Sequence, residues 1–507
     1  MNWRRLRAGW PARFRESRAS ARPARVIAVE FIRAGIARRL ARCGDCGNRA
    51  GLLPASRRQQ TSSNHRPVPD LQQPSDSEGA LPDPNSLRNR LTATFAALRI
   101  RNYRLFFIGQ GISLVGTWVR RTAMGWLVYE LTGSTVQLGL VMGLALLPMF
   151  VLSPWAGAIA DRVDKRRMII LTQVMATATS AAIAALIFLH CIQVWHLMVI
   201  STLSGVAFAF EVPTRQSFIV EMVGRDKLMN AIALNSGLVN LSRVLGPALA
   251  GLLMGWVGMG SCFALDALSY VVVTVTLFML QLPDFEKRHQ PQSQWESLVE
   301  GAREVRRNRR VGVILTLLAA VGVFGWSFET LMPAIARDLM KLQAIRYGAL
   351  MSLLGVGATA GALFVASRTA GSNRRAMVFG GVWMLVAGMY LVAMLGAVLG
   401  ASSAAFWGVG SALLLAGMGA VTFMSTANTL VQTSVDDRIR GRIMGIWAVA
   451  FGGSIPLGSF ISGFVARAVS PFIAIAAFGT VLLAVSLTVY FRLPSERTVA
   501  MTSGFQN

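Results

Sequence analysis

Residues 136–190 read VQLGLVMGLALLPMFVLSPWAGAIADRVDKRRMIILTQVMATATSAAIAALIFLH. Two apolar blocks, 136–160 and 167–190, flank a short loop that is rich in arginine and lysine. Each block is long enough for a helix to cross a hydrocarbon layer about 30 Å thick. The stretch therefore predicts two transmembrane helices joined by a charged turn.

The same pattern recurs on both sides of this stretch. Apolar residues make up 53% of the 507-residue chain and charged residues 15%, whereas soluble domains carry about 25% charged residues. We expect spans at 104–130, 136–160, 167–190, 197–218, 231–256, 261–281, 311–336, 346–367, 376–400, 404–425, 443–466 and 470–492. The sequence thus predicts an all-α membrane protein with twelve transmembrane helices.

An internal repeat divides these spans into two groups. Gly205–Gly251 aligns without a gap with Gly417–Gly463, at an offset of 212 residues. Two parallel six-helix halves are a known transporter architecture. We therefore expect two six-helix bundles, with an amphipathic or solvated helix between them. The expected domains are a tail at 1–97, bundles at 98–282 and 311–495, a cytoplasmic linker at 283–310 and a second tail at 496–507.

Loop charges predict the orientation. If the loop between the first and second spans is counted as loop one, the even-numbered loops carry 20 Arg and Lys residues and the odd-numbered loops carry four. Cationic loops stay in the cytoplasm, which places both termini and the long middle loop there. We expect the membrane to be a bacterial inner membrane. The same rule explains the net charge of +26 without nucleic acid as a partner.

The first 90 residues differ from the rest. They hold 18 Arg and no Lys and show no periodic apolar pattern, so we expect them to be disordered. A transit peptide, a lipid-binding arm or a miscalled start codon each fits this composition. Cys43 and Cys46 form one CxxC without a second pair, so no metal site is expected.

The loop after the second span carries a specific motif. Gly157, Asp161, Arg162, Arg166 and Arg167 lie in the order that resembles the signature loop of the major facilitator superfamily, with Asp164 in place of its usual glycine. The resemblance implies that Asp161 faces the start of span eleven, near 441–444, and latches the two halves on the cytoplasmic side. A helix N-terminus favours an anion there. The alternative is a loop that only sets topology.

The fifth span carries a second motif. Gly237, Gly246, Pro247 and Gly251 resemble the glycine–proline motif of exporters in this superfamily, although ordinary helix packing also uses small residues. The arginine that the family places in span four is replaced by Ser201. Strings such as 116–118, 131–134 and 213–216 resemble the transmembrane secretion effector branch, which includes the enterobactin exporter.

Ionisable residues within apolar spans are costly and mark functional sites by default. Candidate cavity or coupling residues are Arg120, Arg121, Arg243, Asp266 and Glu329. We expect one of the two adjacent arginines to line a cavity, and Arg243 to bind the cargo. Asp266 and Glu329 either exchange protons or form structural pairs. Glu211 and Arg215 are four residues apart, which predicts an ion pair on one helix.

These features predict a secondary transporter and not an enzyme, with no catalytic residue and no cofactor. The resemblance implies proton-coupled efflux of a siderophore, drug or other amphiphilic small molecule by alternating access. Protons and membrane lipids are the other expected partners, and the chain is expected to be a monomer. A lysophospholipid flippase and a non-transporting membrane sensor are the alternatives.

Overall fold

Long apolar helices make up nearly all of the chain that the computed structural model describes, which is residues 95–224, 226–281, 294–368 and 373–492. All of these residues lie within one compact unit. The first half of the chain contributes η1 (Ala96–Arg99), α3 (Arg101–Thr132), α4 (Thr135–Arg162), α5 (Lys165–Phe188), α6 (Val194–Val223), α7 (Leu228–Trp256) and α8 (Met259–Phe278). The second half contributes α9 (Gln294–Arg307), α10 (Arg309–Ala320), η2 (Val321–Gly325), α11 (Ser327–Ala334), η3 (Ile335–Leu339), α12 (Ala344–Ala366), α13 (Arg374–Leu399), α14 (Ser403–Thr433), α15 (Asp437–Ala468) and α16 (Pro471–Arg492).

Within the described residues, eleven segments are long and apolar enough to cross a membrane, counting 309–339 as one. They correspond to eleven of the twelve predicted spans. The remaining predicted span, 104–130, lies inside α3, a 32-residue helix that is not among the eleven. Arg120 and Arg121 lie within α3, and two cations lower the mean hydropathy of any window that contains them.

Span seven differs from the single regular helix that its sequence predicts. It consists of α10 and α11, with the π-helical segments η2 and η3 after each of them. Pro333 lies inside α11 and removes a backbone donor there. Single π-helical turns interrupt α-helices mostly at functional positions. Glu329 and Thr330 lie on α11, between the two π-helical segments.

Short polar caps begin several helices. The Ser134 hydroxyl accepts the Gln137 amide at the start of α4, and Asn373 does the same for Ala376 at α13. Asp164, which replaces the usual glycine of the loop motif, accepts the amides of Arg166 and Arg167. Asp164 therefore begins α5 as an N-cap, which satisfies orphan backbone donors.

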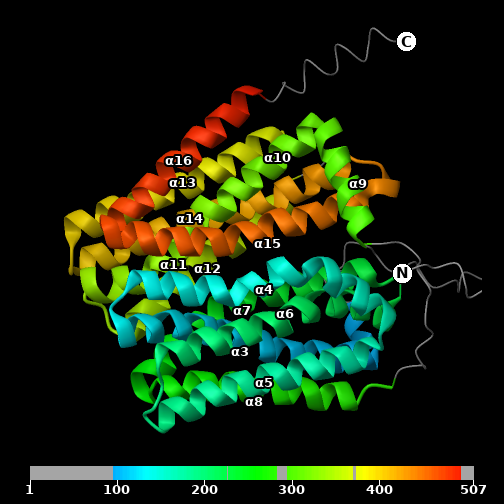
Figure 1. The fold of residues 1–507 in the computed structure, drawn as a ribbon, viewed down its shortest axis with the longest axis horizontal. Helices are drawn as coiled ribbons and strands as arrows, with labels where there is room; N and C mark the ends of the chain where they lie inside the picture. Colours follow the sequence, from blue (N-terminus) through cyan, green and yellow to red (C-terminus); the bar gives the residue numbers. More distant parts are fainter. Residues whose placement is uncertain (1–94, 225, 282–293, 369–372, 493–507) are drawn as a thin grey trace, which may run out of the picture. The chain divides into compact units, whose positions relative to one another are not determined.

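Helix packing separates the described helices into two sets, α3–α8 and α10–α16, which occupy the lower and upper parts of Figure 1. The two most extensive contacts between the sets are those of α4 with α15 and of α7 with α12, and α11 also contacts α3 and α4. The linker helix α9 packs on α15. Glu300 of α9 pairs with Arg442 of α15, with 2.9 Å between Oε2 and Nη1.

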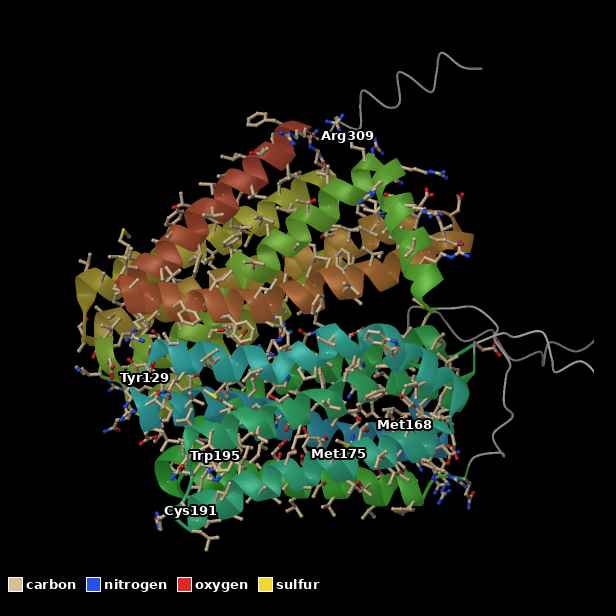
Figure 2. All side chains as sticks on the ribbon, viewed as in Figure 1. Tyr129, Met168, Met175, Cys191, Trp195 and Arg309 are labelled. Carbon is tan, nitrogen blue, oxygen red and sulfur yellow. The ribbon has the colours of Figure 1, made fainter. Side chains whose placement is uncertain are left out.

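The two ends of the helices differ in charge. We call the "basic end" the one that carries the loops after α4, α6, α8, α12 and α14, and the other the "far end". Figure 2 shows Met168 and Arg309 toward one end and Tyr129 and Cys191 toward the other. Near the far end, Gly139 of α4 meets Gly463 of α15, and Gly251 of α7 meets Gly348 of α12.

One glycine of each pair belongs to the internal repeat, and the other two are separated by a similar offset. Gly463 lies 212 residues after Gly251, and Gly348 lies 209 residues after Gly139. A Cβ on Gly463 would lie 2.5 Å from the Thr135 carbonyl oxygen, and one on Gly348 would lie 2.7 Å from the Gly251 Cα. Such approaches need residues without side chains. The two crossings are thus equivalent contacts that bring the two helix sets together at the far end.

Candidate functional site: a charged cavity between the two helix sets

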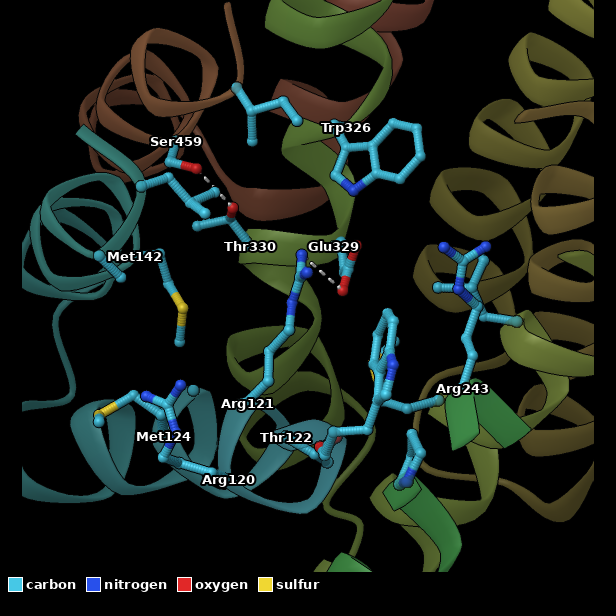
Figure 3. Close-up of a pocket in the computed structure, with 18 of the residues that line it drawn as sticks. Arg120, Arg121, Thr122, Met124, Met142, Arg243, Trp326, Glu329, Thr330 and Ser459 are labelled. Atoms are coloured by element: carbon cyan, nitrogen blue, oxygen red, sulfur yellow. Dashed lines mark hydrogen bonds and ion pairs between the residues drawn. The ribbon is translucent and has the colours of Figure 1, made fainter. Parts of the chain in front are cut away.

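A cavity lies on the basic side of the two glycine crossings. Its walls come from both helix sets and are mostly apolar, with Met142, Phe208 and Met351 among the lining side chains. Its charged lining residues are Arg120, Arg121, Arg243 and Glu329. Figure 3 shows these four side chains together with Trp326 and the Thr330–Ser459 hydrogen bond.

Arg120 pairs with an acid of its own helix set. Its Nε lies 3.0 Å from Oδ2 of Asp266 on α8, whose side chain is fully buried. Ser180 of α5 donates to the same oxygen at 2.6 Å, and Arg120 also contacts the Tyr270 hydroxyl. Removing one partner of such a buried pair costs about 3–5 kcal/mol, because the other charge is left uncompensated.

Arg121 pairs across the two helix sets. Its Nη2 lies 3.2 Å from Oε1 of Glu329 on α11, and Figure 3 shows the two side chains pointing toward one another. The side chains are 40% and 20% exposed, so this pair is accessible from the cavity. Both adjacent arginines line the cavity, although their side chains extend in different directions from α3. The expectation that only one of them would do so was wrong.

Arg243 forms no ion pair with any described residue. Its guanidinium carbon lies 5.2 Å from the centre of the Trp118 ring, and Arg121 lies at the same distance from that ring. Its buried Nε has no hydrogen-bond partner. A cation near an aromatic face gains about 0.5–2 kcal/mol, which only partly offsets the cost of removing the charge from water.

The cavity therefore holds one uncompensated positive charge. Asp266 balances Arg120 and Glu329 balances Arg121, while Arg243 has no acid of its own. Ser201 also lines the cavity, and its buried hydroxyl has no partner. An amphiphilic cargo could place an anionic or accepting group at Arg243 and its apolar body along the methionines.

The residues of the loop motif lie at the basic end. The Asp161 and Arg162 side chains fall outside the described part of the structure, so the latch has no structural test. Gly157 of α4 has open space beside it. Arg166 donates to the Phe278 carbonyl oxygen at 3.1 Å, and Arg167 pairs with Asp164 at 3.4 Å.

The glycine–proline motif of α7 divides into two parts. A Cβ on Gly246 would lie 2.3 Å from the Trp118 Cβ, so this glycine permits α7 to approach α3. Pro247 lines the cavity, and Gly251 belongs to a far-end crossing. Gly237 has open space beside it and takes no part in either contact.

Sequence reasoning identified the charges but missed their neighbours. Trp118 precedes Arg121 by three residues, a spacing that brings side chains together on a helix, so local spacing could have found this contact. Tyr270 and Ser180 carried no comparable signal. The predicted Glu211–Arg215 pair is confirmed, with 3.0 Å between Oε1 and Nη1. In the described ranges, no group of three or more His, Cys, Asp or Glu residues could hold a metal ion.

Known proteins share this architecture and this sequence pattern. Residues 92–505 match the family described as transmembrane secretion effector. The chain belongs to the transmembrane secretion effector family of major facilitator transporters. This chain is therefore a membrane transporter and not an enzyme.

Individual relatives cover most of this chain. The staphyloferrin A transporter of Staphylococcus aureus is 23% identical over 76% of this chain and 95% of its own length. The enterobactin exporter EntS of Shigella flexneri is 25% identical over 79% of this chain and 93% of its own. The crystal structure of the nucleoside transporter NupG is 12% identical, covers 78% of this chain and 100% of its own, and superposes with a TM-score of 0.62, which shows the shared fold. These relatives favour a transporter over a flippase or a sensor.

Proposed function

We propose that this transporter exports a small amphiphilic molecule, such as a siderophore or a drug, by alternating access. The observation that carries the proposal is the cavity between the two helix sets, with residues of both sets in its walls. A site at the interface of two related halves is exposed to either side in turn when the halves rock. The glycine crossings close the far end, so release there requires them to separate.

The basic end faces the cytoplasm of a bacterial cell, with both termini on that side of the inner membrane. Cationic loops gather at this end, in agreement with the positive-inside rule. The Asp161 latch acts at the same end, where it would hold the halves together once the far end has opened. The proposed division into tail, bundle, linker, bundle and tail keeps the boundaries given above. The transporter works as a monomer in contact with membrane lipids.

The proton gradient supplies the energy for export when the transporter cannot bind the proton and the cargo at the same time. Glu329 faces the cavity and as a carboxylate can accept a hydroxyl or ammonium group of the cargo. Protonation removes the negative charge, so the carboxyl group accepts more weakly and its hold on the cargo is reduced. Asp266 lies outside the lining of this cavity and acts on it through Arg120. Either acid, or both, exchanges the proton.

Transport in proteoliposomes tests this function. The probes are the iron-free forms of enterobactin and staphyloferrin A, taken from the names of the two relatives. With an imposed proton gradient, we expect the full chain to concentrate at least one probe against its own gradient, and a protonophore to abolish this. Neutralising Asp266 or Glu329 should remove the uphill step while counterflow exchange persists. Equal fluxes with and without the gradient would contradict proton coupling.

A further inference from the structure

A second cavity lies inside the first helix set. It is separate from the cavity between the two helix sets that contains Arg121, Arg243 and Glu329, which we call the cargo cavity. Helices α3, α5, α6 and α8 all contribute to its walls. The lining is largely polar and includes Gln110, Ser113, Thr179, Glu211 and Tyr270. Gln110 is 2% exposed, and its Oε1 has no hydrogen-bond partner. A polar cavity with an unpartnered acceptor in its wall is a suitable site for ordered water.

Asp266 adjoins this cavity through its partners. Arg120 and Ser180, which both bind its Oδ2, line the second cavity. The other oxygen, Oδ1, is buried and has no hydrogen-bond partner. Burying a carboxylate oxygen without a donor is costly, and a proton added at Oδ1 removes that cost. Asp266 thus offers one oxygen to its ion pair and the other to a proton.

Few titratable groups face Asp266. Arg120 comes from α3, Glu211 from α6 and Tyr270 from α8 itself, while α5 contributes the neutral Ser180. Cys262, one turn away on α8, contacts the Ala250 carbonyl oxygen instead. No charged group of α7 is among the described contacts of Asp266. Arg120 is therefore the counter-charge at this site, and Glu211 is the second acid.

Glu211 lies on the basic-end side of the second cavity. It pairs with Arg215, and both residues lie in the part of α6 that runs toward Val223. Thr117, which hydrogen-bonds to Tyr270 at 3.1 Å, lies in the same lining. Hydroxyl and carboxylate groups alternating with water can pass a proton along such a wall. The route from Asp266 to the basic end then does not cross the cargo cavity.

Arg120 connects the two cavities, because it lines both of them. When cargo lies beside Arg120, the Arg120 guanidinium stays paired with Asp266. This pairing favours the ionised form of the Asp266 carboxyl group, so the proton leaves for the second cavity. Protonation of Asp266 removes the charge that holds Arg120, and the freed guanidinium occupies cargo space. By linkage, each ligand weakens the other to the same extent, as antiport requires.

We infer that the second cavity is a proton chamber. Asp266, which adjoins the chamber through Arg120 and Ser180, holds the transported proton, and Glu211 in the chamber wall relays it to the basic end on a route separate from that of the cargo. This inference rests on the proposed proton coupling and assigns it to Asp266. Asp266 Oδ1 accepts the proton from water in the chamber, and water takes it back when the Arg120–Asp266 ion pair re-forms.

Infrared difference spectroscopy of the purified full chain in lipid tests the chamber without any cargo. A pH titration should show the carbonyl stretch of a protonated carboxyl group, which Asp266→Asn removes and Glu329→Gln retains. Asp266→Glu keeps a titratable group and should shift the band, which covers the case in which Asp266→Asn does not fold.

Kinetics after a light-triggered proton release test the route. We expect Glu211→Gln and Thr179→Val to slow protonation by roughly tenfold or more, because Glu211 is the relay carboxylate and Thr179 is a hydroxyl of the same cavity lining. The matched control is Thr122→Val, which removes a hydroxyl from the lining of the cargo cavity alone and should leave the rate unchanged. A band lost in Glu329→Gln but kept in Asp266→Asn overturns the inference, as do unchanged rates in both route variants. Absence of transport with these spectra intact overturns only the proposed function.

Discussion

The side chain of Arg121 on α3 reaches Glu329 on α11, 208 residues later, with 3.2 Å between Nη2 and Oε1. The pair joins the two helix sets at the wall of the cargo cavity, on the basic side of the glycine crossings. Any rocking of one helix set against the other therefore changes this contact. The pair is accessible to cargo, unlike the fully buried Asp266.

A double-mutant cycle measures this bridge. Arg121→Gln and Glu329→Gln should each shift the protein toward the arrangement that is open at the far end, and the double variant should shift it by less than the sum. We expect a coupling of about 1 kcal/mol, toward the low end for residues in contact because the pair is partly exposed. Far-end labelling of a Thr330→Cys background with an impermeant thiol reagent reports the populations. Strict additivity would show that the bridge does not couple the two helix sets.

Arg243 is the cargo-binding charge in this mechanism. Arg243→Gln should weaken the binding of an anionic probe by roughly tenfold or more, since a hydrogen bond to a charged group contributes about 1.5–3 kcal/mol. Arg243→Lys keeps the charge and serves as the matched control. Binding isotherms of a probe acid and its uncharged amide separate charge from shape. Equal losses for acid and amide would mean that Arg243 acts by packing on Trp118.

The glycine crossings should control access from the far end. In Gly348→Leu the side chain would collide with the Pro247 carbonyl oxygen and the Gly251 backbone, so the far end cannot close. We expect far-end labelling to rise and uphill transport to fall by at least about tenfold, since overpacking costs about 1–3 kcal/mol. Gly380→Leu on α13 places the same side chain in open space and is the control. Normal labelling in Gly348→Leu would contradict the role of this crossing.

A substitution that changes only the charge of Asp161 tests the role of the loop motif. Asp161→Asn keeps the size of the side chain, so expression and insertion should stay normal while transport falls strongly and the basic end becomes more accessible to thiol reagents. Asp164→Asn is the matched control, because asparagine retains the cap at the start of α5. Transport by Asp161→Asn at the rate of the unmodified chain would leave the motif a purely topological role.

Local sequence patterns were sufficient to predict the membrane-spanning architecture. Long apolar blocks, the spacing of cationic loops and the loop from Gly157 to Arg167 are all properties of neighbouring residues, and each follows from transfer free energies or helix geometry. The Glu211–Arg215 pair was predictable for the same reason, because four residues along a helix place two side chains on one face. Even the repeat that relates Gly251 to Gly463 is visible in the linear order.

Only the tertiary structure decided which charge neutralises which. Asp266 lies 146 residues after Arg120, and nothing local distinguishes Arg120 from Arg121 as its partner. The same holds for the unpaired Arg243, whose isolation depends on the helices around it. Span seven was predicted as one regular helix, yet η2 and η3 interrupt it. Contacts between distant segments depend on where whole helices cross. The periodicity of apolar residues along one sequence does not specify those crossing points.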